Sequence, residues 1–206
     1  MQRQPWSQSR FKDTFATAEN ARGYVDKHAN WARSAGKVFA ERLRKRGLAP
    51  KRILEVGSGS GDTAIVLAEA FPAAQVVGVD LSEHMVAIAA ERATAAGVAE
   101  RISFVTGDAA RLPCADGEFD VVLSQDTLHL LDDPLPMLEE CARVLKPAGR
   151  LFVRSVRRSW LGWLDPIFKT GYTAGELADL AVRAKLPEIK VEGSLIYLLL
   201  EAARQK

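Results

Sequence analysis

Gly57, Gly59 and Gly61 are the first residues of the sequence whose spacing could serve chemistry. They lie in the stretch LEVGSGSGDT, residues 54–63, directly after a short apolar run. Glycines at this density mark a place where the backbone turns sharply or must come close to a ligand. The stretch therefore indicates a nucleotide-like cofactor, a bound phosphate, or a tight turn from a strand into a helix.

Acidic residues flank these glycines. Glu55 precedes them, and Asp80 ends the apolar run VVGVD about twenty residues later, where a carboxylate can accept both hydroxyls of a ribose. The G-x-G-x-x-G fingerprint of NAD sites fails, because its third glycine position is Asp62, whose carboxylate would repel a pyrophosphate. A P-loop fails as well, since no Gly-Lys-Ser/Thr follows.

The elements that must position these residues alternate between strand and helix. Short runs rich in Val, Ile and Leu predict strands, while helical spacing, Ser82 as an N-cap, and Gly47 and Gly97 after helix ends predict helices. We expect strands at 52–56, 75–80, 102–108, 119–124 and 150–156, and helices at 11–47 (as two segments), 62–71, 84–96 and 134–145. This alternation predicts a mostly parallel sheet with helices on both faces.

The last fifty residues change character. Thr173 and Glu176 form a T-x-x-E capping box before a helix. The runs EIKVE and LIYLLLEA follow, separated only by Gly193 and Ser194, which favours a two-residue type II′ hairpin. One of these two strands must therefore run against the other strands of the sheet.

Composition is that of a globular protein with one domain, 1–206. The chain has 206 residues, 48% hydrophobic and 26% charged. We expect neither a membrane span nor a leader, because the longest apolar run is LIYLLL and the N-terminus lacks the apolar core of a signal peptide. Cys114 and Cys141 stand without metal-ligand spacing, which predicts no metal site and fits a reducing cytoplasm.

Charge is distributed unevenly along the chain. Residues 1–52 carry 13 Lys and Arg against 4 Asp and Glu, residues 53–149 carry 5 against 16, and residues 150–206 carry 10 against 6. An acidic centre between basic flanks predicts a site for a cationic ligand. A solvated surface with chance clustering is the equal alternative.

Five segments resemble, in order and spacing, the motif series of class I S-adenosylmethionine-dependent methyltransferases: LEVGSGSG, VVGVDLS, GDAARLP, FDVVLSQDTLHLL and LKPAGRLFV. The resemblance covers residues 50–156 and is greatest to the small-molecule type that includes the ubiquinone/menaquinone biosynthesis methyltransferases. It implies an α/β fold with a Rossmann-like, seven-stranded, mostly parallel sheet and a reversed C-terminal hairpin strand. It also implies an N-terminal helical cover (1–49), a cofactor-binding core (50–156), and an acceptor-side segment with the terminal hairpin (157–206).

The resemblance further implies that S-adenosylmethionine is the cofactor. The glycine loop would approach its methionyl part, Glu55 would bind near its amino group or shape the loop, and Asp80 would hold the ribose hydroxyls. The sulfonium and ammonium charges of this cofactor suit such carboxylates. The other cofactor residues implied are Ser58 in the loop, Leu81 and Met85 against the adenine, Asp108 and Ala109 at its edge, and Ser124 and Gln125 beside the methyl group.

No catalytic residue is fixed by the resemblance, because methyl transfer from a sulfonium depends mainly on alignment. His129, just past the fourth expected strand, is the candidate base, although relatives often carry a histidine here without that role. Asp126 could act as a base or be an ordinary loop residue. Tyr24 and His28 on the N-terminal cover are candidates to contact substrate, or else they pack on the helix surface.

The acceptor must be inferred from the covering segments. Residues 154–172 combine Trp160 and Trp163 with basic side chains. They would suit a small-molecule acceptor with an apolar or aromatic body and an anionic group. The same residues could rest on a membrane surface or pack on the core. Nucleic acid is disfavoured as a partner, because SQDT stands where relatives that methylate exocyclic amines carry an Asn-Pro-Pro-type motif. The oligomeric state stays open.

Two other functions compete with methyl transfer. An NAD(P)-dependent oxidoreductase is opposed by Asp62 and by the terminal hairpin. A non-catalytic S-adenosylmethionine-binding protein is excluded by no feature of the sequence.

Overall fold

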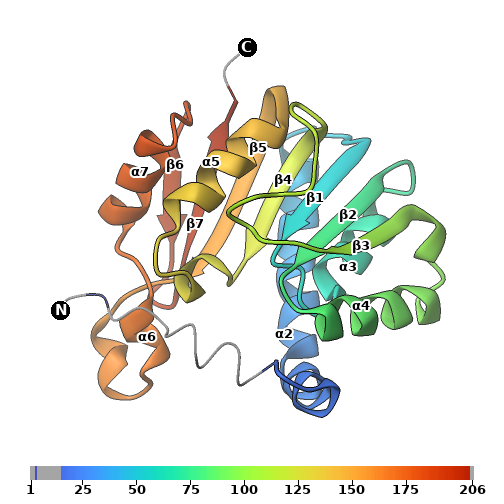
Figure 1. The fold of residues 1–206 in the computed structure, drawn as a ribbon. Coiled ribbons are helices and arrows are strands. Elements are labelled where there is room, and N and C mark those ends of the chain that lie inside the picture. The colour runs from blue at the N-terminus through green and yellow to red at the C-terminus, as the bar shows by residue number, and fades with distance from the viewer. Residues whose placement is uncertain (1–2, 4–14, 205–206) are drawn as a thin grey trace.

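A seven-stranded sheet forms the centre of the computed structural model, which describes residue 3 and residues 15–204 (Figure 1). Its strand order is β3-β2-β1-β4-β5-β7-β6. The strands are β1 Arg52–Val56, β2 Gln75–Asp80, β3 Ile102–Thr106, β4 Phe119–Gln125, β5 Leu145–Val156, β6 Lys190–Gly193 and β7 Tyr197–Ala203. Strands β1 to β5 pair in parallel, whereas β7 runs antiparallel to both β5 and β6. The predicted mostly parallel sheet with one reversed hairpin strand is confirmed.

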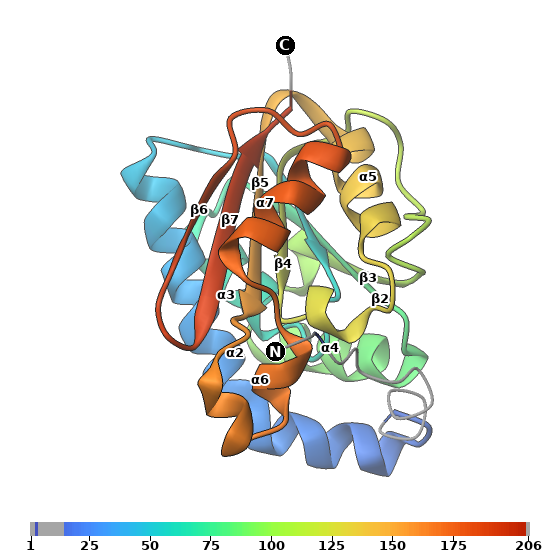
Figure 2. The same cartoon turned by 90° about the vertical axis from the view of Figure 1, so that its left-hand side faces the viewer.

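Helices cover both faces of this sheet, as the view turned by 90° shows (Figure 2). On one face lie α2 Ala18–Lys45, α3 Asp62–Ala70 and α4 Glu83–Ala95. On the other lie α5 Leu135–Val144 and α7 Ala174–Arg183, while the short α6 Ile167–Thr170 follows β5 near its carboxyl end. Two buried apolar clusters, one on each face, include residues of these helices and of the central strands.

Local signals place the helix ends where the sequence predicts them. The Ser82 side chain accepts from the Met85 amide at the start of α4, and Gly97 follows that helix with φ +71°. The capping box of Thr173 and Glu176 is present at the start of α7. Each side chain satisfies an amide that the first helical turn leaves without a backbone partner.

Two local predictions are wrong. Among the described residues, the N-terminal cover is one continuous helix, α2, and not two segments; within it, Gly36 lets α2 approach Val66 of α3 closely. Residues 11–14 of the predicted range lie outside the described residues. The hairpin turn is not formed by Gly193 and Ser194, because Gly193 remains in β6 paired with Leu198 and lacks the positive φ of a type II′ turn, and the Ser194 amide donates to the Tyr197 carbonyl across the turn.

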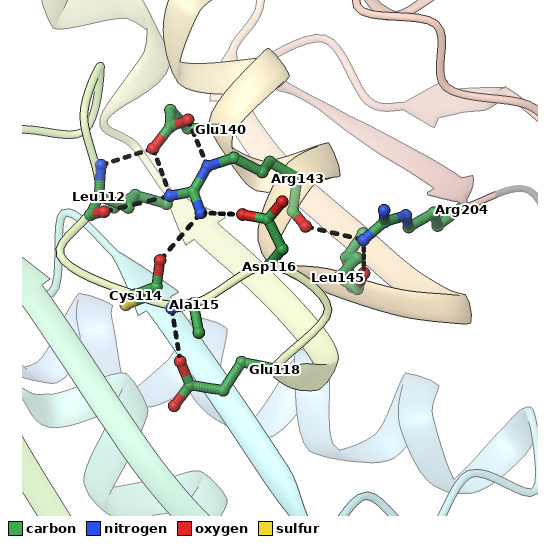
Figure 3. Close-up of polar contacts among 9 residues, drawn as sticks. All are labelled: Leu112, Cys114, Ala115, Asp116, Glu118, Glu140, Arg143, Leu145 and Arg204. Atoms are coloured by element: carbon green, nitrogen blue, oxygen red, sulfur yellow. Dashed lines mark hydrogen bonds and ion pairs between the residues drawn. The ribbon is translucent and has the colours of Figure 1, made fainter.

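Arg143 of α5 joins the β3–β4 connection to the rest of the domain (Figure 3). Its Nε and Nη2 donate to the two carboxylate oxygens of Glu140, each at 2.7 Å, and its Nη1 donates to Asp116 at 2.6 Å. The same guanidinium donates to the carbonyls of Leu112 and Cys114. Such a planar fork of donors fixes a loop that has no strand ladder of its own.

Candidate cofactor and acceptor site

The glycine loop, residues 57–61, leaves the carboxyl end of β1 and uses most of its amides within the protein. Its first two amides both donate to the Val79 carbonyl (2.8 and 3.0 Å), its third to Asp80 Oδ2 (2.8 Å), and its fifth to the Ser58 carbonyl (2.9 Å). A phosphate site needs several free amides aimed at one point. This loop does not offer such a set.

The three glycines of the loop are required for different reasons. All have positive φ, but a Cβ at Gly57 would overlap the Thr127 side chain, and one at Gly61 would lie 2.6 Å from a ring carbon of Phe104. At Gly59, with φ +50°, a Cβ would meet nothing within 4 Å. Packing inside the protein therefore explains the first and third glycines, and only the second faces open space where a ligand could approach.

Glu55 of β1 lies under this loop as a buried carboxylate. The residue is 2% exposed, and its Oε2 has no hydrogen-bond partner. Burial is the largest cause that raises its pKa well above the usual range; hydrogen bonding with the Ala64 backbone and the Thr63 side chain opposes this rise, and the negative charges of Asp62 and Asp80 add to it. A cation arriving beside Glu55 would relieve this unfavourable state.

Asp80, at the carboxyl end of β2, is the second buried carboxylate. Its Oδ2 accepts from the Gly59 amide at 2.8 Å and its Oδ1 from the Ser82 amide at 2.9 Å. Burial raises its pKa, and the ion pairs found among the described residues include neither Asp80 nor Glu55. Two negative groups without a cation of the protein therefore lie beside the glycine loop.

Asp62, at the start of α3, is a buried carboxylate of a different kind. Its side chain is fully buried, Arg92 lies 2.6 Å from its Oδ1, and the Ser60 hydroxyl donates to its Oδ2 at 2.7 Å. Its charge is thus compensated inside the protein. The sequence alone presents Asp62 as an uncompensated charge that repels a pyrophosphate. That expectation needs correction, because Arg92 compensates this carboxylate and both side chains lie at the start of α3.

The comparison with protein families matches residues 54–153 to the family described as "Methyltransferase domain". This match supports a class I methyltransferase domain at residues 54–153. The chain is 42% identical over 123 residues to a demethylmenaquinone methyltransferase of Thermus thermophilus, which covers 60% of this chain and 52% of that protein. It is 37% identical over 133 residues to a 27-O-demethylrifamycin SV methyltransferase of Amycolatopsis mediterranei, covering 63% and 48%.

Solved structures agree with this fold assignment. A SAM-dependent methyltransferase from Aquifex aeolicus superposes with a TM-score of 0.67 at 23% identity, covering 80% of this chain and 88% of that one. The chain spans about half the length of the curated relatives that it matches. The family uses S-adenosylmethionine as its methyl donor.

Four of the other predicted cofactor residues of the methyltransferase domain lie around β2 and the turn after β3. Leu81 is 56% exposed beside Asp80, and Met85 is buried in a small cluster between α2 and α4. Asp108 is exposed and its Oδ1 accepts from the Ala110 amide at 2.8 Å, and Ala109 is partly buried against the core.

Two of the three remaining predicted residues have internal partners. The Ser124 hydroxyl is fully buried and donates to the Val56 carbonyl at 2.8 Å. Gln125 accepts from the Thr63 hydroxyl at 2.7 Å, whereas the buried Ser58 hydroxyl has no hydrogen-bond partner. Ser124 therefore holds the end of β1 against β4, and of the three only Ser58 keeps an unsatisfied polar atom beside the loop.

His129, the candidate base, is 3% exposed in the short 3₁₀ helix Leu128–Leu130. Burial lowers its pKa to about 4, against a smaller opposing effect of Asp126, and its Nδ1 has no partner. The imidazole is therefore neutral at physiological pH and holds a proton weakly. These surroundings do not favour the predicted role as a base.

Tyr24 and His28 lie one turn apart on α2. Their rings stack with centroids 4.1 Å apart, and His28 Nδ1 donates to the Tyr24 carbonyl at 2.8 Å. Burial raises the pKa of Tyr24, and the charges of Asp126 and Asp80 raise it further. That electrostatic effect places the phenol within range of both carboxylates, at the carboxyl end of the sheet.

A cluster around Asp126 was not selected from the sequence. Asp126 follows β4 with φ +52°, its Oδ2 accepts from Trp31 Nε1 at 3.1 Å, and Arg154 lies 3.5 Å away. The Arg154 guanidinium lies over the rings of Trp31 and Tyr197, 4.8 and 4.0 Å from their centroids. Left-handed backbone at a non-glycine residue is often found at functional sites, and the pairing of Gln125 with Arg154 across β4 and β5 creates this cluster.

Trp160 and Trp163, the candidate acceptor contacts, lie in the 3₁₀ helix Trp160–Trp163 after β5. They are 66% and 85% exposed, so neither ring is packed on the core. Among the described residues, no group of three or more His, Cys, Asp or Glu is arranged to hold a metal ion. No helix in residues 15–204 is long and apolar enough to cross a membrane.

Proposed function

We propose that this protein transfers a methyl group from S-adenosylmethionine to a small-molecule acceptor. The observation that carries the proposal is the pair of buried carboxylates, Glu55 and Asp80, which lie beside the glycine loop without a cation of the protein. A ligand with a positive ammonium and a ribose matches both groups. The methyltransferase domain at residues 54–153 supports the same reading.

The residues present fit this cofactor. Glu55, with its unpartnered oxygen, would accept from the ammonium of the methionyl part, and Asp80 has lone pairs left for ribose hydroxyls after accepting one amide on each oxygen. The open space beyond Gly59 would admit the ligand to the loop. The cofactor supplies an activated methyl group on a sulfonium, so the protein has to align the acceptor and shield it from water.

An acceptor with an apolar or aromatic body is supported by a groove between α2 and the β6–β7 hairpin. Its volume is about 590 Å³, and Trp31 and Arg154 link it to Asp126. Val38, Phe39 and Leu199 are among its apolar walls. The names of the relatives, a demethylmenaquinone and a demethylrifamycin methyltransferase, fit acceptors of this kind. A cavity of about 300 Å³ beside Lys51 and Asp120, at the amino ends of β1 and β4, lies far from the glycine loop.

Asp126 is better placed than His129 to receive a proton from an acidic acceptor. Its side chain is 24% exposed, while its Oδ1 has no hydrogen-bond partner. Arg154 compensates its charge, and Trp31 holds its other oxygen. Such a carboxylate can orient a hydroxyl or an N–H of the acceptor in line with the methyl group.

Calorimetric titration followed by a labelled-methyl assay tests the proposal. S-Adenosylmethionine and S-adenosylhomocysteine should both bind with measurable heat, whereas NAD should give none. Label from [methyl-³H]S-adenosylmethionine should then pass to a member of a panel of quinols, phenols and amines. A clean NAD isotherm without binding of the sulfonium compound would support an oxidoreductase instead. Cofactor binding without turnover on any acceptor would support a non-catalytic binding protein.

A cytoplasmic location remains part of the proposal and rests on the two free cysteines, Cys114 and Cys141. Burial raises the pKa of the Cys141 thiol to about 12, so it stays unreactive in the core.

A further inference from the structure

An exposed apolar patch lies outside the cofactor site. It is made of five large side chains: Trp160, Trp163, Leu164, Leu195 and Ile196. Their exposed fractions are 66%, 85%, 76%, 63% and 40%. Single exposed apolar residues are ordinary on protein surfaces, but five on two adjoining segments mark an interaction surface.

The two segments are held together at one end of the molecule. Val156 of β5 pairs with Tyr197 of β7, so the Ser194–Ile196 turn lies at the carboxyl end of β5, where the segment with both tryptophans begins. The Arg157 amide donates to the Ile196 carbonyl and its Nη1 to the Ser194 carbonyl, each at 2.8 Å. In both views the α6 segment projects from the same end of the sheet (Figures 1 and 2).

The composition of this patch fits a lipid surface. Tryptophan and leucine on loop tips suit the boundary between head groups and acyl chains. Of the four Lys and Arg in residues 154–172, Arg154 and Arg158 are ion-paired with Asp126 and Glu176, whereas Arg157 and Lys169 take part in none of the ion pairs found among the described residues. Positive charge around an apolar tip is complementary to anionic lipid head groups.

We propose that the patch formed by residues 160–164 and 194–196 docks on the surface of a bilayer that contains anionic lipid. The patch continues into the groove between α2 and the β6–β7 hairpin, because Ser194 and Tyr197 line that groove. An apolar acceptor dissolved in the bilayer could pass along this route toward Asp126. This delivery role rests on the proposed methyl-transfer function, whereas the membrane contact itself does not.

Cosedimentation with vesicles tests the contact. The full chain is mixed with phosphatidylcholine vesicles containing 0 or 30% phosphatidylglycerol, a range chosen on the order of natural anionic lipid content. We expect binding to the anionic vesicles that weakens as salt is added. The affinity of the double variant W160S/W163S for these vesicles should be lower by about tenfold or more, because it loses the two largest apolar side chains of the patch. The matched control is Val182→Ser, which changes an apolar residue that is 62% exposed near the end of α7.

The outcomes separate the alternatives. Failure of the wild-type chain to bind either vesicle, or equal binding by W160S/W163S, would overturn the proposal. So would a concentration-dependent dimer in light scattering that W160S/W163S abolishes, because a second copy would then cover the patch. Calorimetry of each variant with S-adenosylmethionine is run in parallel. A loss of vesicle binding with cofactor affinity unchanged would leave the proposed function standing.

Discussion

Substitution of Glu55 by glutamine should stabilise the ligand-free protein and weaken cofactor binding. Glu55 is 2% exposed, its Oε2 has no partner, and burial raises its pKa. Glutamine keeps the shape and removes the charge. Glutamine remains a buried polar group, but it removes the cost of burying an ionised carboxylate without a cation, so we expect the unfolding free energy to rise by about 1–3 kcal/mol at neutral pH. For a domain of this size, each kcal/mol corresponds to about 2–4 °C in Tm.

The gain should depend on pH in a defined direction. The folded-state pKa of Glu55 is raised above its value in the unfolded chain, which is about 4.3. The group therefore contributes stability that is fully present below about pH 4.3 and is lost as the pH rises through the folded-state pKa. The stability difference between Glu55→Gln and wild type should accordingly be small at pH 4 and grow toward pH 8.

Cofactor binding should respond in the opposite sense. A hydrogen bond to a charged group contributes about 1.5–3 kcal/mol, so its loss should raise the Kd for S-adenosylmethionine about 10- to 150-fold. Thermal unfolding across pH measures the first effect, and isothermal titration calorimetry measures the second. Glu201→Gln is the matched control. Its carboxylate is also buried, but Arg46 lies 2.6 Å from it, so this substitution should destabilise the protein.

Two results would refute the reasoning about Glu55. Destabilisation by Glu55→Gln to the same extent as by Glu201→Gln would show that the hydrogen bonds of the Glu55 carboxylate outweigh the cost of burying its charge. An unchanged Kd for S-adenosylmethionine, together with wild-type unfolding, would show that no cationic part of the cofactor lies beside it.

Three further predictions concern the loop, the scaffold and the buried histidine. Gly57→Ala should unfold the loop, and Thr127→Ala should partly rescue it. Gly59→Ala should keep the fold, at a cost of about 1–2 kcal/mol for its left-handed φ, and lose cofactor affinity. Denaturation measures the stability of each variant, and calorimetry measures its cofactor affinity. Arg143→Ala and Arg143→Lys should each lower the unfolding free energy by about 2–3 kcal/mol in urea without changing cofactor affinity, because only the arginine fork reaches all its acceptors. His129 has a folded-state pKa of about 4, so stability that is present above pH 6.5 should fall as the pH drops toward 4, and His129→Gln should flatten that decline. A decline as steep in His129→Gln as in wild type would contradict the last prediction.

The parallel core of the fold could be predicted because its signals are local. Apolar runs of five to seven residues became β1, β2 and β4 with bounds within one residue, and Ser82 and Thr173 capped the helices that they precede. The reversed β7 followed from the closeness of two strand patterns in the sequence, which leaves no room for a crossover.

The features that sequence reasoning missed depend on contacts between distant elements. Glycine has a low helix propensity, yet Gly36 is the residue at which α2 packs closely on α3. The sequence leaves Asp126 open between a base and a loop residue, because only the fold shows that α2 brings Trp31 and β5 brings Arg154 to its carboxylate. His129 is a candidate base from its position in the sequence, but its burial lowers its pKa. The sequence does not display the surroundings that set this pKa.

The distinction between a sulfonium cofactor and a dinucleotide rests on where unpaired charge remains. From the sequence, Asp62 alone argued against a pyrophosphate, but Arg92 and Ser60 already satisfy that carboxylate, so it exerts little repulsion of its own. The stronger argument is that the buried start of α3 and the internal bonds of four of the five loop amides leave few donors for a phosphate. The buried carboxyl groups that do lack a protein cation are Glu55 and Asp80, beside the loop. A site with carboxylates unpaired and amides occupied selects for positive charge, which is the property that separates S-adenosylmethionine from NAD.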